Sequence, residues 1–390
     1  MASATQFFEN PVRRRKVCIV ATVPFAVNVF LSPQVKRLSR DYDVTIVSNG
    51  VAGDLIPTLT GISFVSLPIE RKIAVGRDIA AFFILWKFLH TQRFDVVHSI
   101  MPKSGLLAMM AAKFAGVPFR LHTFTGQVWA TQSGFKKVLL KSLDRLMACC
   151  ATRVFADSHS QRLFLIEQKV VSPARIGVLA EGSAAGVDLN RFKADDAQRH
   201  GLRKSLCIAD DAVIFLFVGR LTRDKGLLDL SRAFASIAAA NEKVHLMVVG
   251  PDEGGLASEI ALLTREFSER VHILGFSEAP ERYMAAADVL CLPSYREGFG
   301  AVIIEAAAVG LPAIASRIYG ITDAVDEGVT GFLHRPAASD EIMLAMSILA
   351  SEKQVRKTMG EAARARVEER FSQAHVVDAY SEFYSAMLAK

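Results

Sequence analysis

The stretch DVLCLPSYREGFGAVIIEAAAVG, residues 288–310, contains the pattern that decides the fold. Its first part, residues 288–293, is an apolar run that predicts a buried strand. A loop with Gly298 and Gly300 follows, and an apolar helix is predicted over residues 301–309. Strand, loop and helix in this order form the repeating unit of a parallel α/β sheet.

The same alternation of strand and helix extends along the whole chain in two series. Helices are predicted between the strands, for example over residues 32–40, 77–91 and 104–114. The strands are nearly continuous apolar runs, which indicates buried parallel sheets. The predicted strands are 17–23, 43–48, 62–67, 95–100, 120–125, 153–158 and 175–180 in the first series, then 212–219, 244–250, 271–276, 288–293 and 312–316.

A polar stretch, residues 188–211, separates the two series. We therefore expect an α/β protein with two Rossmann-like, doubly wound lobes that face each other across a cleft, where ligands bind at the C-terminal ends of the strands. The expected domains are residues 1–188 and 189–370, followed by a C-terminal helix over residues 371–390. That helix is aromatic and amphipathic, so it either packs back on the first domain or covers its own.

Composition excludes several classes of protein. The chain has 390 residues, of which 51% are hydrophobic and 22% are charged, so it can fill large cores. Five cysteines without a C-x-x-C pair argue against a disulfide framework, a zinc ribbon and a redox dithiol. No stretch has the length and apolarity of a membrane span or of a secretory signal, so a reduced, cytosolic location is the simplest interpretation.

Charge is uneven along the chain. Residues 1–188 contain 23 Lys and Arg but only 12 Asp and Glu, an excess of 11 positive charges, whereas the remainder has an excess of five negative charges. A basic half suits an anionic partner, although a merely basic surface would look the same. We expect no nucleic-acid partner, because no module of interleaved basic and aromatic residues is present.

The loop after the predicted strand at 212–219 is the first candidate site. Arg220 and Lys225 follow that strand, and a helix is predicted to begin near Leu227. Two cations beside a helix N-terminus predict an anion site, for which a diphosphate is the expected occupant. The alternative is that both cations are simply solvated. The chain has no G-x-x-x-x-G-K-[ST] motif, which argues against a kinase or a nucleoside-triphosphate motor.

The loop at 293–300 is the second candidate site, with Glu297 before the helix and Glu305 one turn inside it. An acid in an otherwise apolar helix is costly unless hydroxyl or cationic groups accompany it. The vicinal hydroxyls of a ribose would satisfy Glu305, and the alternative is a structural salt bridge.

These motifs resemble the retaining glycosyltransferases of family 4, which have the GT-B fold. The resemblance lies in residues 287–300 with Glu305, and in Gly219-Arg220 with Lys225-Gly226. It extends to residues 182–192, which look like the family's segment at the start of the second lobe, and to residues 328–332, which look like the entry to a late strand. In the first half, residues 94–98, 101–107 and 116–118 resemble the subgroup that extends lipid-linked sugars in bacterial surface polysaccharide synthesis.

The resemblance implies a role for each residue of the two loops. Arg220 and Lys225 would neutralise the donor diphosphate, assisted by the backbone amides of Gly298, Phe299 and Gly300. Glu305 would bind the ribose hydroxyls, and Glu297 would contact the transferred sugar. The family needs no metal and no further cofactor, and the nine histidines of this chain form no ligand-spaced cluster.

The resemblance also implies the reaction. We expect a metal-independent, retaining hexosyltransferase that moves a sugar, most simply from a UDP-sugar, to a polyprenyl-diphosphate-linked saccharide in O-antigen, capsule or exopolysaccharide synthesis. It would be cytoplasmic and peripheral on the inner face of the cytoplasmic membrane, with residues 1–188 binding the acceptor. The alternatives are a nucleotide-sugar epimerase with the GT-B fold, a transferase with a soluble acceptor, and a sugar-binding relative without activity.

Two departures from the family pattern are visible. Many relatives have a glycine-rich loop after the first strand, whereas residues 22–28 here form an apolar loop without glycine. Lipid-acceptor relatives often place a histidine just before the glycine that corresponds to Gly126. Thr125 takes that place here, and His122 is therefore a weaker candidate for the catalytic histidine.

The basic first half suggests contact with a membrane. We expect its cations to face anionic lipid head groups or an acceptor diphosphate. The segment 79–89 is either an amphipathic helix that dips into the membrane or a helix packed on the sheet between the strands at 62–67 and 95–100. The cations in question are Arg13, Arg14, Arg15, Lys16, Arg71, Lys72, Arg77 and Lys103.

Overall fold

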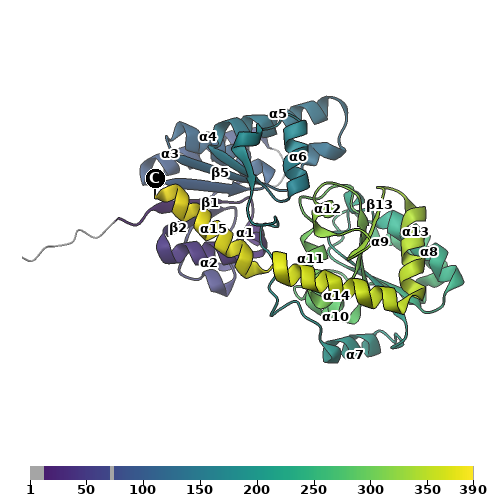
Figure 1. The fold of residues 1–390 in the computed structure, drawn as a ribbon. Helices are drawn as coiled ribbons and strands as arrows, with labels where there is room; N and C mark the ends of the chain where they lie inside the picture. Colours follow the sequence, from purple (N-terminus) through teal and green to yellow (C-terminus); the bar gives the residue numbers. More distant parts are fainter. Residues whose placement is uncertain (1–12, 71–73, 390) are drawn as a thin grey trace, which may run out of the picture. The chain divides into compact units, whose positions relative to one another are not determined.

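The computed structural model describes residues 13–70 and 74–389, and it contains two parallel β-sheets (Figure 1). The first has seven strands in the order β3-β2-β1-β4-β5-β6-β7, and the second has six in the order β10-β9-β8-β11-β12-β13. Each sheet begins with three strands in reverse chain order and then continues on the other side of its first strand. This is the doubly wound arrangement, and the expected α/β fold with two Rossmann-like sheets is confirmed.

Each apolar run that was predicted to be a strand overlaps an observed strand, although β1 and β5 begin one residue earlier than predicted. β13 (Gly331–His334) is the exception, since no apolar run predicted it and only the family motif at residues 328–332 marked its start. The other strands are β1 (Lys16–Val20), β2 (Asp43–Ser48), β3 (Ser63–Ser66), β4 (Val96–Ile100), β5 (Phe119–Phe124), β6 (Arg153–Ala156), β7 (Ile176–Val178), β8 (Val213–Val218), β9 (Val244–Val249), β10 (Val271–Ile273), β11 (Val289–Leu292) and β12 (Ala313–Ser316).

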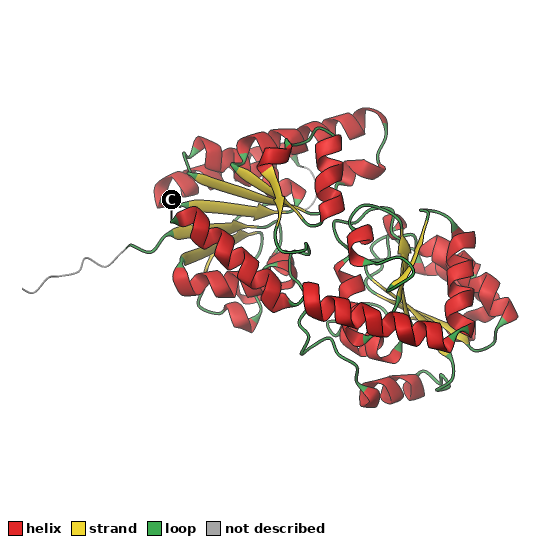
Figure 2. Ribbon diagram, in the orientation of Figure 1, coloured by secondary structure: helices red, strands yellow, loops and turns green. Residues whose placement is uncertain are grey.

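Helices lie on both faces of each sheet (Figure 2), as expected for strands that are apolar on both sides. They are α1 (Pro24–Phe30), α2 (Ser32–Asp41), α3 (Val75–Gln92), α4 (Pro102–Phe114), α5 (Gly134–Cys150), α6 (His159–Glu167), α7 (Asp196–Ser205), α8 (Leu227–Ala240), α9 (Ala257–Leu263), α10 (Pro280–Ala286), α11 (Ala301–Val309), α12 (Ile321–Ala324), α13 (Ser339–Ser351), α14 (Lys353–Arg370) and α15 (Gln373–Leu388). No helix in the described part of the chain is long and apolar enough to cross a membrane.

The connection after β1 differs from the prediction. Residues 22–28 were expected to form a loop, but α1 begins at Pro24, directly after a short link. Proline is well accommodated in the first turn of a helix, because the amide hydrogen it lacks has no partner there. Pro24, Ala26 and Val27 are buried, so the apolar character of this segment reflects packing.

The chain divides into two compact units, Met1–Leu121 and His122–Lys390, and the division falls inside β5. The domain boundary expected between residues 188 and 189 stays a prediction. In the first unit, α3 packs against α4 and buries Ala81, Leu85 and Leu89. The large apolar side chains that α3 leaves exposed are Val75, Ile79, Phe83, Ile84 and Trp86.

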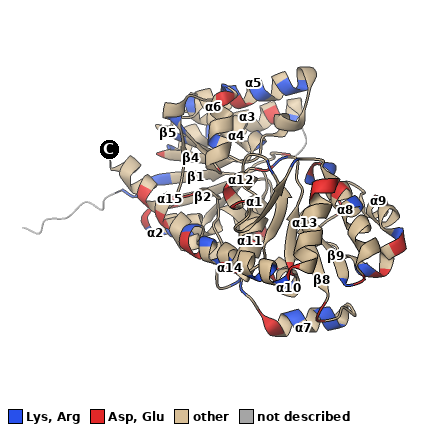
Figure 3. Cartoon of the chain, turned by 45° about the vertical axis from the view of Figure 1, so that its right-hand side comes forward, with Lys and Arg blue, Asp and Glu red and all other residues tan. Residues whose placement is uncertain are grey.

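Several cations expected to face lipid are paired within the first unit. Arg15 lies 3.0 Å from Asp95, Lys103 lies 2.6 Å from Asp78, and Arg77 forms an ion pair with Glu70. Their charge is therefore partly compensated by neighbouring acids. Arg71 and Lys72 lie outside the described residues. Figure 3 shows the distribution of charged residues over the elements.

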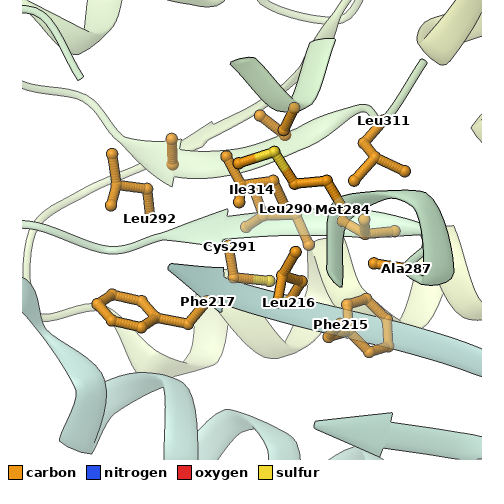
Figure 4. Packing of buried hydrophobic residues seen from close by; sticks show 14 of the residues in the cluster. Phe215, Leu216, Phe217, Met284, Ala287, Leu290, Cys291, Leu292, Leu311 and Ile314 are labelled. Carbon is orange, nitrogen blue, oxygen red and sulfur yellow. The ribbon is translucent and has the colours of Figure 1, made fainter. Parts of the chain in front are cut away.

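The second unit has a continuous apolar core around β8 and β11 (Figure 4). Phe215, Leu216 and Phe217 of β8 are fully buried beside Leu290 and Cys291 of β11. Such packing on both faces fixes the two central strands and therefore the loops that follow them.

The C-terminal helix α15 also packs in this unit. The ring of Phe383 meets Phe155 of β6 edge-on, with 4.9 Å between the centroids. Tyr380 hydrogen bonds to the Thr123 side chain, and Val376 and Tyr384 are buried. The amphipathic pattern of this tail therefore corresponds to a packed helix.

Candidate active site

The candidate site is built from the loops that follow β8 and β11. These strands are parallel neighbours, with Phe215 opposite Val289, so their following loops leave the same edge of the sheet. Gly226, between the first loop and α8, has a φ of +69°, and a Cβ there would lie 2.0 Å from the Pro293 carbonyl oxygen. Only glycine permits this approach, which brings the two loops into contact.

Lys225 and Glu297 meet at this contact. The Lys225 ammonium forms an ion pair with Glu297 Oε1, and the Ser294 hydroxyl donates a hydrogen bond of 2.8 Å to the same oxygen. Both charged side chains are largely shielded from solvent. The structure thus brings together two of the residues that the sequence predicted for the site.

A second ion pair, which the sequence analysis missed, joins the same two loops. Arg296 Nη2 lies 2.8 Å from Asp224 Oδ2, and Thr222 Oγ1 donates to Asp224 Oδ1 at 2.6 Å. The backbone amide of Tyr295 donates to the Asp224 carbonyl at 2.8 Å. Although burial opposes it, the hydrogen bond from Thr222 and the charge of Arg296 lower the pKa of Asp224.

Asp224 and Arg296 directly precede Lys225 and Glu297, so two adjacent salt bridges hold the loops in one register. The signal for the missed pair was present in the sequence as an opposite charge immediately before each predicted residue. Spacing alone gave no means of pairing residues 72 positions apart.

Arg220 lies outside this cluster. Its guanidinium is 3.0 Å from Glu253 in the loop after β9, and both side chains are substantially exposed. An exposed ion pair of this kind holds its partners weakly, so Arg220 is available to an incoming anion.

The N-terminus of α11 begins at the end of the second loop. Gly300 is the N-cap, with a φ of +82° and no side-chain cap, so the first amides of the helix are left to other acceptors. Phe299 is buried and packs against Phe371, with 5.3 Å between the ring centroids. The side chain of Phe299 therefore belongs to the core, and the proposed binding role of its backbone amide stays a prediction.

Glu305 lies about one turn inside α11. Burial raises its pKa to about 7, with Arg191 lowering and Glu281 raising it, and those two residues are themselves 2.9 Å apart as an ion pair. Within the described residues the Glu305 carboxylate has no hydrogen-bond partner. A shielded acid without a partner is the feature expected of a group that binds the hydroxyls of a ligand.

Two further segments of the same unit meet the second loop at Gly298. A Cβ on Gly298 would lie 2.9 Å from the Gly126 amide nitrogen and 3.2 Å from Asp157 Oδ2. The Ser158 hydroxyl donates to the Gly298 carbonyl at 3.1 Å. The loops after β5 and β6 therefore contact the loop that contains Glu297.

Asp157 is an acid that the sequence analysis did not place in the site. Burial raises its pKa to about 7, the Ala184 amide lowers it and the nearby Glu297 raises it. Its Oδ1 is buried and has no hydrogen-bond partner among the described residues. The position of this carboxyl beside Gly298 was not visible from the sequence, because residues 157 and 298 are far apart in the chain.

His122 and Thr125 have different surroundings. His122 is buried inside β5, with its ring edge-on to Phe124 at 4.8 Å. Strand β5 ends at Phe124, and the Thr125 carbonyl accepts hydrogen bonds of 2.7 Å from Gln127 and Gln161. Thr125 therefore belongs to the turn that reaches Gly298, whereas His122 lies in the preceding strand.

The described residues contain no group of three or more His, Cys, Asp or Glu side chains that could hold a metal ion. The chemistry available at the site is that of cations, carboxylates and helix amides. Such a set can bind a diphosphate through Lys225 and the α11 amides, and hydroxyl groups through the two glutamates.

Two families match this chain. Residues 26–182 match the family described as Glycosyl transferase 4-like domain, and residues 198–366 match Glycosyl transferases group 1. CapM of Staphylococcus aureus, a capsular polysaccharide biosynthesis glycosyltransferase, is 29% identical over 325 residues, covering 83% of this chain and 84% of that protein. The UDP-Gal:α-D-GlcNAc-diphosphoundecaprenol α-1,3-galactosyltransferase of Escherichia coli is 28% identical over 322 residues, covering 82% of each chain.

Solved structures show the same fold. Anabaena Alr3699/HepE in complex with UDP-glucose superimposes with a TM-score of 0.79 at 20% identity, covering 95% of this chain and 99% of that one. Fold and matched families together define a glycosyltransferase of the GT-B class. The chain belongs to the retaining glycosyltransferases of family 4, whose members are generally metal-independent. The predicted fold, family and enzyme class are confirmed, and the roles of single residues stay predictions.

Proposed function

We propose that the protein transfers a hexose from a UDP-sugar to a saccharide carried on polyprenyl diphosphate, with retention at the anomeric carbon. The observation that supports this most is the ion pair that joins Lys225 to Glu297 beside the N-terminus of α11, because a cation, a carboxylate and free helix amides suit a diphosphate joined to a sugar. The printed names of the S. aureus and E. coli relatives support the acceptor class and a role in surface polysaccharide synthesis.

The cations and helix amides act on the leaving group. As the bond between the anomeric carbon and the phosphate oxygen breaks, negative charge accumulates on the departing UDP. Lys225, Arg220 and the amides at Gly298–Gly300 stabilise that charge, and such preorganised electrostatics are commonly the largest catalytic contribution. Lys225 exchanges the carboxylate of Glu297 for the diphosphate when the donor binds.

The two glutamates hold the ends of the donor. Glu305, which has no protein partner among the described residues, accepts hydrogen bonds from the ribose hydroxyls. Glu297, released from Lys225, accepts from hydroxyls of the transferred sugar. This division of roles follows the family pattern, and it uses the carboxylates for binding and orientation.

The chemical step needs no protein nucleophile. The acceptor hydroxyl oxygen bonds to the anomeric carbon on the face from which UDP departs, and its proton passes to the departing phosphate. Thr125, in the turn against Gly298, and His122, in the strand behind it, are the proposed residues on the sugar side of this step.

The proposal includes the partners and the place of the reaction. The donor is a nucleotide-sugar, the acceptor is a polyprenyl-diphosphate-linked saccharide, and the protein lies peripherally on an anionic membrane surface at the inner face of the cytoplasmic membrane. Nucleic acid has no part in it. The domain roles remain those expected from the sequence, with residues 1–188 for the acceptor and residues 189–370 for the donor.

Transfer of label tests the proposal. The full chain is incubated with radiolabelled UDP-sugars and a polyprenyl-diphosphate-linked sugar in detergent, and label entering the organic phase is counted. Lys225→Ala and Glu305→Ala are each expected to reduce transfer about 100-fold or more, because each removes binding that strengthens towards the transition state. Thr125→Ala and His122→Ala compare the two residues on the sugar side.

Lys353→Ala and Glu369→Ala, at exposed positions of α14, are the matched controls and should keep full activity. Unchanged turnover in Lys225→Ala and Glu305→Ala would contradict the assigned roles. If the label stays in the aqueous phase but is attached to a new acceptor, the protein is a transferase with a soluble acceptor. If the sugar of the donor is isomerised when no acceptor is present, the protein is an epimerase.

A further inference from the structure

Helix α5 (Gly134–Cys150) exposes a row of large apolar side chains. Phe135 is 81% exposed, Val138 63%, Leu139 46% and Leu146 42%. Residues 135, 139, 142 and 146 follow one another at the i, i+4, i+7, i+11 spacing of one helix face. Apart from the exposed Ser142, this face is apolar where a helix normally presents polar residues to water.

The opposite face of α5 anchors it firmly. Asp144, Met147, Ala148 and Cys150 are buried, and the Trp129 indole donates a hydrogen bond of 2.7 Å to the Asp144 carboxylate. The exposed row therefore belongs to a helix with a complete interior face. The apolar side chains of this row do not contribute to the packing of this unit.

A row of basic residues runs beside the apolar row. Lys137, Lys141 and Arg145 follow at i, i+4 and i+8, and Lys136 lies on the other side of the apolar row. Lys141 donates to the Gln168 side chain at 2.8 Å and Arg145 to the Lys169 carbonyl at 2.9 Å, so both have neutral acceptors.

The positive charge of this row is uncompensated. None of the four cations forms a salt bridge within the described residues, and the one acid of α5, Asp144, is buried. Partial burial, and then the charges of Arg145, Lys137 and Lys169, lower the pKa of Lys141. An anionic partner would relieve this repulsion.

We propose that α5 lies in the head-group region of an anionic lipid bilayer, with its apolar row towards the acyl chains and its cations among the phosphates. An apolar face bordered by Lys and Arg is the pattern of an interfacial helix. A second copy of the same face would bring two basic rows together, so charge disfavours self-association. This deepens the proposed function, on which it rests for the reason why the enzyme meets a membrane.

Vesicle binding tests the proposal without requiring catalysis. The full chain is sedimented with vesicles of 70% phosphatidylcholine and 30% phosphatidylglycerol, and with vesicles of phosphatidylcholine alone. Wild type should bind the anionic vesicles preferentially. Phe135→Ser/Leu139→Ser and Lys136→Ser/Lys137→Ser should each weaken that binding about tenfold or more, because each cation or buried apolar group adds to membrane affinity.

Matched controls separate the surface from general effects. Leu262→Ser/Leu344→Ser, at two exposed leucines of α9 and α13, and Lys353→Ser/Lys357→Ser, at exposed lysines of α14, should bind as wild type does. All four variants change exposed or partly exposed residues, and an unaltered melting temperature verifies their folds. The proposal would be overturned if wild type did not bind anionic vesicles, or if the α5 variants bound them as well as wild type does.

Two further measurements distinguish a membrane surface from a dimer interface and from the active site. A dimer of wild type in light scattering that is lost in Phe135→Ser/Leu139→Ser would assign this face to a second copy and also overturn the proposal. Transfer to an acceptor in detergent should be the same in wild type and in Phe135→Ser/Leu139→Ser. Failure of all transfer with intact vesicle binding would therefore reject the proposed function and leave the membrane surface standing.

Discussion

At the residue scale, two shielded carboxyls contribute to the way in which the stability of the second unit depends on pH. Burial raises the pKa of both Asp157 and Glu305 to about 7. In the unfolded chain such groups titrate near pH 4. Between these values the two carboxyls bind more protons in the native state than in the unfolded state, so their contribution to the free energy of unfolding falls as the pH rises from about 4 to about 7 and then levels off.

We predict that Asp157→Asn removes the part of this pH dependence of stability that the Asp157 carboxyl contributes. We compare the melting temperature of the variant minus that of wild type at the two pH values. This difference should be more positive at pH 8 than at pH 5 by at least about 2 °C, since the melting temperature of a domain of this size changes by ~2–4 °C per kcal/mol of stability. Thermal unfolding at both pH values measures it. Asp211→Asn is the control: hydrogen bonding to Lys243 lowers the pKa of this exposed acid, so its effect should be equal at both values. An equal shift for Asp157→Asn at pH 5 and pH 8 would refute the assignment.

At the element scale, the loops after β8 and β11 behave as one unit because adjacent pairs of opposite charge join them. Asp224 pairs with Arg296, and Lys225 pairs with Glu297, the two residues that we propose to bind the donor. The Arg296 guanidinium also lies 3.4 Å from the Gly126 carbonyl, which extends the contact to the turn after β5. Arg296 is thus a positioning residue, which acts through Glu297.

We predict that Arg296→Ala weakens UDP binding about tenfold, because loss of a charge-assisted pair of this kind is worth ~1.5–3 kcal/mol, part of which relaxation of the loops recovers. Isothermal titration with UDP measures the affinity, and Arg296→Lys should restore part of it through the remaining charge. Arg335→Ala removes the exposed pair with Glu341 and should leave UDP affinity unchanged. Wild-type affinity in Arg296→Ala would show that the pair does not position the site.

At the scale of the whole molecule, the C-terminal helix packs within the second unit, against β6 and β5. The chain at Val187 also pairs with the segment before α15: its amide donates to the Phe371 carbonyl, and the Gln373 amide donates to the Val187 carbonyl. Phe383 and Tyr380 then fix α15 against β6 and β5. Residues at the end of the sequence therefore stabilise strands that come early in the sequence of this unit.

We predict that Phe383→Ala lowers the free energy of unfolding by about 1–2 kcal/mol, less than for a fully buried ring, because Phe383 is partly exposed. Urea denaturation measures this loss. Phe135→Ala, the same substitution at an exposed ring of the same unit, should cost almost nothing. Equal losses in the two variants would show that α15 adds no packing energy.

The sequence by itself determined all the strands except β13, the two-sheet α/β class and the loops that contain Lys225 and Glu297. Apolar runs bounded by glycine and proline are local signals, and the spacing of the motif residues lies within single loops. Even the expected end of α11 at Gly310 coincides with the observed one, because its φ of +96° suits glycine.

Only the tertiary structure decided which distant residues meet. Asp224 and Arg296 pair, Asp157 lies beside Gly298, and Phe299 turns into the core, because parallel neighbouring strands bring their loops to one edge of the sheet. It also decided that α5 has an exposed apolar face. From the sequence alone, a row of apolar residues on a helix predicts a buried face, and only the packing shows which rows are covered. Pairing across the sheet and coverage of a helix face depend on the whole chain, and no local pattern records them.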